Sequence, residues 1–133
     1  METSRPVIVK RVPQSLNLRQ ARVFLEEVRP LLEHDRPQLV FDLSLVNRLD
    51  AAGVEMLLYC MKEASRRDGD LKLASLSPHA RVVMDLTRSS RLFEIYATSS
   101  EAVRSFSGYL PNIVRQFYPE TPEQKVDAGR EAA

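Results

Sequence analysis

The pattern of apolar and polar positions divides the chain into alternating strand-like and helix-like segments. Strand patterns cover residues 7–12, 38–43, 71–75 and 92–96, and helical periodicity covers residues 18–33, 51–67, 78–87 and 99–108. Because strands and helices alternate, the pattern predicts an α/β fold with an open, mostly parallel sheet and right-handed crossovers. Segment 38–43 is almost continuously apolar, which is typical of a parallel strand that is covered on both faces.

Polar residues at the start of each helical segment are suited to N-cap positions. We expect Asn17, Ser77 and Thr98 to be N-caps, with Pro78 at a first helical position and Glu101 completing a capping box. A fourth N-cap is expected before segment 51–67, where the carboxylate of Asp50 would accept from the N–H of Ala52 or Gly53 and contribute about 1 kcal/mol.

Other positions predict how the helices end and pack. Gly69 is suited to a left-handed conformation after the helix 51–67, and Pro30 is expected to kink or shorten the first helix. In the helix 78–87, Val83 and Leu86 are expected to face the core.

Length and composition indicate one modest domain with no electrostatic preference for polyanions. The chain has 133 residues and a net charge of +1, which argues against nucleic acid or anionic membrane as a main partner. No apolar run approaches the roughly 20 residues that span a bilayer, and residues 1–6 do not resemble a secretory signal. The single cysteine, Cys60, has no partner for an internal disulfide, and we expect a stand-alone cytoplasmic domain with Cys60 in the core.

No group of residues predicts catalysis, a metal site or a cofactor. Gly-rich phosphate loops are absent from the sequence, and His34 and His79 are isolated residues that we expect at the surface. Ser44, Ser89 and Ser90 are expected in turns. A turn hydrogen bond is favoured for Ser44 over a role as an alternative phosphoacceptor, and Ser89 and Ser90 would be exposed enough for modification. The sequence therefore predicts a protein that is not an enzyme.

The run FDLSLVNRLDAAGVEMLL, residues 41–58, carries a family resemblance. It resembles the core motif of STAS domains, in which an apolar strand and Asp-Leu-Ser precede an Asp-Ser-Ser/Ala-Gly turn and an apolar helix. The resemblance extends over about residues 7–107 and implies the STAS fold, an open sheet of about four to five strands with about four helices. An additional first strand, usual in the family, is expected to be missing or vestigial here. In place of the family's phosphorylated Ser or Thr, this sequence has Ala51.

The resemblance also implies a function, that of an anti-sigma factor antagonist. Its partner would be an anti-sigma factor or related regulator with a kinase-like ATP-binding fold, and binding would release the sigma factor. Because Ala51 has no hydroxyl group, we expect no switching by phosphorylation at this turn. The implied contact surface consists of Asn47, Asp50, Ala51, Ala52, Gly53, Val54 and Glu55, with Ser77 and Arg81 adjacent.

Two other functions stay open under the same resemblance. One is an accessory subunit of a lipid-transport ATP-binding-cassette complex, and the other is a scaffold in an assembly of several STAS domains. We expect the STAS domain to end near residue 109, with an amphipathic extension at residues 110–118 and a disordered tail at residues 119–133. The extension would pack on its own domain, or cap a homo-oligomer or a partner groove.

Overall fold

A four-stranded parallel sheet forms the centre of the computed structural model, which describes residues 6–107. The strands are β1 (Ile8–Arg11), β3 (Gln38–Asp42), β5 (Asp70–Ala74) and β6 (Ile95–Tyr96), and they lie side by side in this order. All three pairings are parallel. The predicted α/β fold with a mostly parallel sheet is therefore confirmed.

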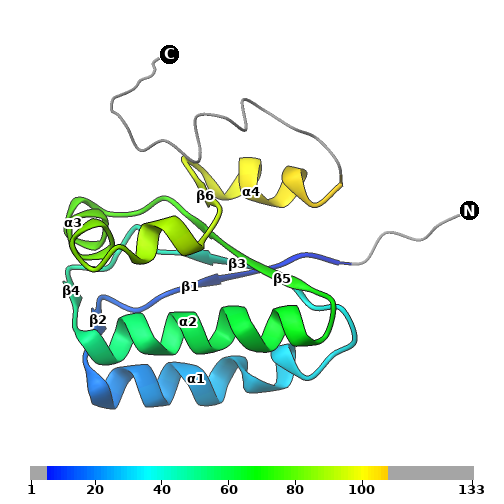
Figure 1. The fold of residues 1–133 in the computed structure, drawn as a ribbon, viewed down its shortest axis with the longest axis horizontal. Coiled ribbons are helices and arrows are strands. Elements are labelled where there is room, and N and C mark those ends of the chain that lie inside the picture. The colour runs from blue at the N-terminus through cyan, green and yellow to red at the C-terminus, as the bar shows by residue number, and fades with distance from the viewer. Residues whose placement is uncertain (1–5, 108–133) are drawn as a thin grey trace, which may run out of the picture.

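Helices cover both faces of this sheet (Figure 1). The contacting helices α1 (Leu18–Leu32) and α2 (Ala51–Arg66) lie on one face, and the shorter α4 (Ser99–Ser105) packs on the other face against β3, β5 and β6. The remaining helix, α3 (Pro78–Leu86), packs against a 3-10 turn, η1 (Ser89–Leu92).

Two apolar clusters follow from this layering. The larger cluster joins the sheet to α1 and α2, and in it the rings of Phe24 and Phe41 meet edge to face with centroids 5.2 Å apart. Ala80 and Met84 of α3 belong to the same cluster. The smaller cluster lies under α4 and contains Val40, Ala74, Tyr96 and Ala102. Alternate residues of β3 therefore enter different cores, as expected for a strand that is buried on both faces.

Local capping bonds confirm three of the predicted helix starts. The side chains of Asn17, Ser77 and Thr98 accept hydrogen bonds from the N–H groups of Gln20, Ala80 and Glu101. Pro30 lies inside the last turn of α1, which continues to Leu32. A proline inside a helix removes one backbone hydrogen bond, but so close to the C-terminus of α1 it can disturb only the last turn.

Four local predictions were wrong. The left-handed residue after α2 is Asp68, with φ 63°, and not Gly69. Gly69 instead allows close packing against Pro37, because a Cβ atom there would lie 2.0 Å from the carbonyl oxygen of Pro37. Leu86 is 79% exposed and does not face the core. The predicted strand 92–96 is only Ile95–Tyr96, since the chain first closes the 3-10 turn η1. The last helix ends at Ser105, short of residue 108.

Two short strands that the sequence did not reveal form a second parallel ladder. β2 (Ser15–Leu16) pairs with β4 (Arg48–Leu49). In the described part of the chain, β1 and β6 are the two edges of the main sheet. The extension 110–118, the tail 119–133 and most of any strand preceding β1 lie outside the described residues.

Candidate protein-interaction surface

The turn between β4 and α2 is held by the segment that precedes α1. Leu16 pairs with Leu49, and the carbonyl oxygen of Leu16 accepts from the N–H of Asp50 at 3.4 Å. Two residues before Leu16, the carbonyl oxygen of Gln14 accepts from the N–H groups of Asn47 at 2.8 Å and Arg48 at 3.1 Å. These backbone bonds join residues more than 30 positions apart, so the conformation of the turn depends on tertiary structure.

Asp50 occupies the N-cap position of α2, but its carboxylate does not cap the helix. Its backbone is extended, with φ −92° and ψ 173°, and its side chain makes no capping hydrogen bond. Instead, the carbonyl oxygen of Asp50 accepts from the N–H groups of Gly53 at 2.9 Å and Val54 at 3.1 Å. The predicted carboxylate cap is therefore wrong, and the exposed carboxylate stands at the positive end of the helix dipole.

Gly53 allows α2 to begin in contact with the small ladder. A Cβ atom at this position would lie 2.6 Å from the carbonyl oxygen of Leu16 and 2.8 Å from the Cδ1 of Leu49. Both distances are below van der Waals contact, so any side chain would push the helix start away from β2 and β4. The absence of a side chain at Gly53 therefore lets the start of α2 pack directly on β2 and β4.

The start of α3 braces the other side of the turn. The hydroxyl group of Ser77 donates to the carbonyl oxygen of Val46 and accepts from the N–H of Ala80 at 3.1 Å. The Nε2 of His79 accepts from the N–H of Leu49 at 3.1 Å. Sequence reasoning treated His79 as isolated, and no local spacing reveals a bond to a residue 30 positions away.

The structure divides the predicted contact residues by exposure. Asn47, Asp50, Ala51, Glu55 and Arg81 are exposed, and Ala52 and Ser77 are half-buried. Gly53 and Val54 are buried, and the side chain of Val54 is only 5% exposed within the larger core. A partner therefore cannot reach Val54, and only the exposed residues of the predicted set are accessible.

Two exposed leucines flank this set and were missed from the sequence. Leu45 is 45% exposed in the loop before β4, and Leu18 is 56% exposed at the start of α1, two residues after the strand that holds the turn. Leu45 lies in an apolar stretch and Leu18 lies between Asn17 and Arg19, and neither setting shows from the sequence that the leucine faces outward. We call the exposed residues Leu18, Leu45, Asn47, Asp50, Ala51, Glu55 and Arg81 the turn surface.

The serines considered for modification lie in different environments. Ser44 is exposed and its N–H donates to the carboxylate of Asp42 at 2.8 Å, so it lies in a turn as predicted. Ser89 is only 4% exposed, and its hydroxyl is 2.9 Å from that of Thr87. The expectation that Ser89 is accessible is therefore wrong, while Ser90 is half-buried.

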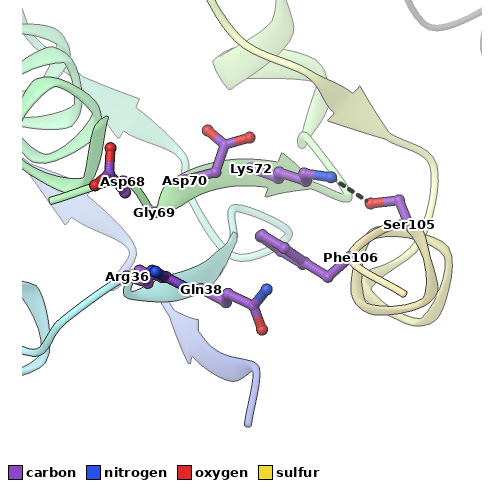
Figure 2. Close-up of a pocket in the computed structure, with 8 residues that line it drawn as sticks. All are labelled: Arg36, Gln38, Asp68, Gly69, Asp70, Lys72, Ser105 and Phe106. Carbon is purple, nitrogen blue, oxygen red and sulfur yellow. Dashed lines mark hydrogen bonds between the residues drawn. The ribbon is translucent and has the colours of Figure 1, made fainter. Parts of the chain in front are cut away.

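A polar pocket lies at the opposite end of the sheet, where β3 and β5 begin (Figure 2). Its volume is about 360 Å³, and Gln38, Asp70, Lys72 and Phe106 are among the residues that line it. The ammonium group of Lys72 bonds to the hydroxyl of Ser105 at 2.7 Å and to the carboxylate of Glu94 at 3.2 Å. Burial, followed by the charge of Glu94, raises the pKa of Asp70. Lys72 is thus already engaged by protein groups, and the pocket offers no unsatisfied buried charge from this residue.

Other chemically capable groups are dispersed or inaccessible. Within residues 6–107, no group of three His, Cys, Asp or Glu side chains could hold a metal ion, and no helix is long and apolar enough to cross a membrane. Cys60 is buried, and burial is the main cause that raises the pKa of its thiol to about 12. The thiol contacts the sulfur of Met56 at 3.7 Å. A thiol of this kind is protonated at neutral pH and reacts slowly.

The layered parallel sheet and the ordered turn before α2 define a small α/β domain with an exposed acid at a helix start. The sequence profile of the STAS domain family matches residues 1–102, which is most of the chain. The chain belongs to the STAS domain family.

Individual relatives agree with this membership. A protein of Bordetella bronchiseptica that is provisionally named anti-sigma factor antagonist BtrV is 24% identical over 96 residues, covering 72% of this chain and 83% of that protein. The crystal structure of a provisionally named anti-sigma factor antagonist of Thermotoga maritima is 25% identical, with a TM-score of 0.68 and coverage of 76% and 87% of the two chains.

A third relative supports the fold alone. The structure of an anti-sigma-factor antagonist (STAS) domain protein from Planctomyces limnophilus is 21% identical, with a TM-score of 0.68, and the match covers 74% of this chain and 89% of that one.

Proposed function

We propose that this protein is an anti-sigma factor antagonist that binds a protein regulator with a kinase-like ATP-binding fold through the turn surface. The observation that carries the proposal is the exposed carboxylate of Asp50, which makes no capping bond beside the exposed methyl group of Ala51. A cap residue that is free of the cap bond is available to a donor from a partner. The names of the relatives from Bordetella bronchiseptica and Thermotoga maritima support the assignment of function.

The composition of the turn surface suits a protein partner. Its charged residues Asp50, Glu55 and Arg81 are exposed, and so are the leucines Leu18 and Leu45 of the same surface. Protein interfaces combine apolar anchors with a polar rim, and the rim controls orientation and rate more than affinity. The bonds from Gln14, Leu16 and His79 hold the turn before binding, which limits the ordering cost of association.

We propose further that binding is not switched by phosphorylation at this turn. Ala51 occupies the position at which related domains carry a phosphorylated hydroxyl, and a methyl group cannot accept a phosphoryl group. A phosphate there would add about −1.5 to −2 charges next to Asp50. Without it, the surface stays in one electrostatic state, and regulation has to act on the partner or on the amount of this protein.

We infer no catalytic step for this protein. Domains of this family are generally non-catalytic, and a competitive binding mechanism requires none. The partner would supply any nucleotide chemistry.

Affinity capture with matched variants tests the docking proposal. Tagged wild-type protein, Asp50→Lys and the control Glu27→Lys are compared, because Glu27 is an exposed acid on α1 outside the turn surface. We expect the wild type and Glu27→Lys to recover the same kinase-fold anti-sigma factor, and Asp50→Lys to recover at least about tenfold less, as for a lost charged contact. Recovery of a transport ATPase or of other STAS proteins would instead favour one of the two alternative functions. Equal recovery by all three variants would refute the role of Asp50.

Substitutions at position 51 test the absence of a phosphorylation switch. With the purified partner and ATP, Ala51→Ser is expected to restore a phosphoacceptor, and Ala51→Glu is expected to weaken binding by placing a second charge beside Asp50. Stoichiometric phosphate on the wild-type peptide that spans the turn would contradict the proposal.

A further inference from the structure

A second exposed apolar region lies on α3 and the 3-10 turn that follows it. Val82 and Leu86 are one helical turn apart on the same face of α3 and are 55% and 79% exposed. Leu92 is 58% exposed in η1, which packs against α3. Within residues 6–107, Leu86 is the most exposed of the large apolar side chains. Adjacent exposed aliphatic side chains on packed elements are typical of a docking site.

Unpaired positive charges surround these apolar side chains. Arg81, Arg88 and Arg91 are exposed, and none of them forms an ion pair within the described part of the chain. The acid on the exposed side of α3 is Asp85, so the region carries an excess of positive charge. By contrast, Arg29 and Arg66 on the outer helices pair with glutamates on their own helices.

The backbone at Arg88 gives a third, independent observation. Arg88 has φ 63° and ψ 12°, a left-handed conformation that favours glycine, at the junction of α3 and η1. Backbone strain of this kind is often found at binding surfaces. Here it places Arg88 at the junction between the two elements that carry Leu86 and Leu92.

We propose that this region, the α3 surface (Arg81, Val82, Leu86, Arg88, Arg91 and Leu92), binds an acidic amphipathic helix of a protein partner. Apolar residues on one face of that helix cover Val82, Leu86 and Leu92, and flanking Asp or Glu side chains pair with the arginines. The α3 surface adjoins the turn surface at Arg81 and extends away from it along α3. The proposal does not depend on the role of Asp50.

Two other occupants fit the α3 surface less well. A second copy of this chain would bring two positive regions together, which repels at an interface. Anionic lipid is attracted by only about 1 kcal/mol for each basic residue near the membrane, and α3 has 9 residues, short for a surface-lying helix. Discrete apolar side chains set among a few arginines suit a helix with matching acids better than either alternative.

Two synthetic peptides serve as probes. Both are amphipathic helices with leucines on one face, and they differ only in having Glu or Lys beside the leucines. Backbone amide shifts in NMR spectra, recorded on the full chain during titration, locate the binding site. We expect the Glu peptide to shift the resonances of Val82, Leu86 and Leu92 and to bind at least tenfold tighter than the Lys peptide.

Variants separate the apolar and electrostatic contributions. Leu86→Ser is expected to weaken binding of the Glu peptide roughly tenfold or more, whereas Val23→Ser, which changes an exposed valine of α1 outside both surfaces, leaves it unchanged. The double variant Arg88→Glu with Arg91→Glu is expected to prefer the Lys peptide. Asp50→Lys leaves peptide binding unchanged, which separates this surface from the proposed function. Thermal melts confirm that each variant is folded.

Other outcomes refute the proposal. Equal binding of both peptides, or binding of neither, shows that the α3 surface does not select an acidic helix. Co-sedimentation with phosphatidylserine vesicles that Leu86→Ser abolishes would identify a lipid surface instead. Concentration-dependent self-association that is lost in Leu86→Ser would identify a second copy of this chain.

Discussion

The Nε2 of His79 accepts a hydrogen bond from the N–H of Leu49 at 3.1 Å, and this bond joins the start of α3 to the strand before the Asp50 turn. Only an imidazole with an unprotonated Nε2 can accept it. The turn is thereby held from two sides, by Leu16 through the backbone and by His79 through a side chain. A single histidine thus links the two elements that carry the proposed binding surfaces.

Replacing His79 with alanine is expected to loosen this link. Loss of one partly buried hydrogen bond costs about 0.5–1.5 kcal/mol, so His79→Ala lowers the free energy of unfolding by about that amount in urea titrations. His34→Ala is the control, because His34 is exposed and outside this contact. Amide shifts should spread over residues 47–53 for His79→Ala alone. Equal effects of both substitutions on this segment would show that the His79 bond is not formed in solution.

Gly53→Ala is expected to destabilise the protein, contrary to helix propensity. In an exposed helix interior this change stabilises by up to about 1 kcal/mol, but here the new Cβ would lie 2.6 Å from the carbonyl oxygen of Leu16. Overpacking against backbone costs about 1–3 kcal/mol, measured as a lower free energy of unfolding. Ala51→Gly tests the reverse change at an exposed position and should cost only its propensity. A Gly53→Ala variant as stable as the wild type would show that α2 can move away from the ladder.

The sequence revealed those helix starts that depend on local bonds. Asn17, Ser77 and Thr98 each cap an N–H three positions ahead, so residue type and spacing were sufficient. Asp50 has the same kind of side chain and fails as a cap. Its conformation is set by Leu16, which lies 34 positions earlier, and no local rule contains that bond.

Periodicity failed where an apolar residue faces outward. Leu86 matches the helical pattern of a core position but is 79% exposed, because Ala80 and Met84 already fill the buried side of α3. Leu18 and Leu45 were overlooked because an apolar residue type does not show that the side chain faces outward. An apolar pattern predicts which residues prefer burial, and tertiary packing decides which of them remain available to a partner. His79 was missed because its contact exists only after α3 and β4 meet.

Alkaline pH is expected to destabilise the protein through Cys60 and Tyr96. Burial is the main cause that raises the pKa of each to about 12, from ordinary values of 9.0 and 10.0. The folded state therefore keeps these protons while the unfolded chain releases them, so stability is full below pH 9.0 and falls as pH rises toward 12. The slope is at most about 1.4 kcal/mol per pH unit for each group.

Urea titrations between pH 8 and pH 11 on the wild type and Cys60→Ala measure this dependence. The variant loses some packing at every pH, but its stability should stay level until the pH approaches 10.0, where Tyr96 of the unfolded chain loses its proton. Identical pH slopes for the two proteins between pH 9.0 and 10.0 would show that the thiol titrates normally in the fold.

The buried ammonium group of Lys72, which is paired with Glu94, is expected to anchor α4 to the sheet. Lys72 is 9% exposed in its side chain, lies 3.2 Å from Glu94, and donates to Ser105 of α4 at 2.7 Å, with its ammonium group 4.2 Å from the ring centre of Phe106. Removing one partner of a buried pair costs about 3–5 kcal/mol, and partial solvation of Glu94 reduces this to roughly 2–4 kcal/mol for Lys72→Ala. Lys72→Met, which keeps the apolar stem, should lose less.

A double-mutant cycle isolates the charged contact from packing. Lys72→Met and Glu94→Gln are measured singly and together by urea denaturation, and a coupling of about 1–2 kcal/mol is expected for a close, partly buried pair. Amide hydrogen exchange should rise first in α4, because Ser105 loses its bond to Lys72. Lys62→Ala, at an exposed position on α2, serves as the control and should change neither quantity. Strictly additive effects would mean that the apolar stem of Lys72 and its contact with Phe106, rather than the ion pair, hold α4 in place.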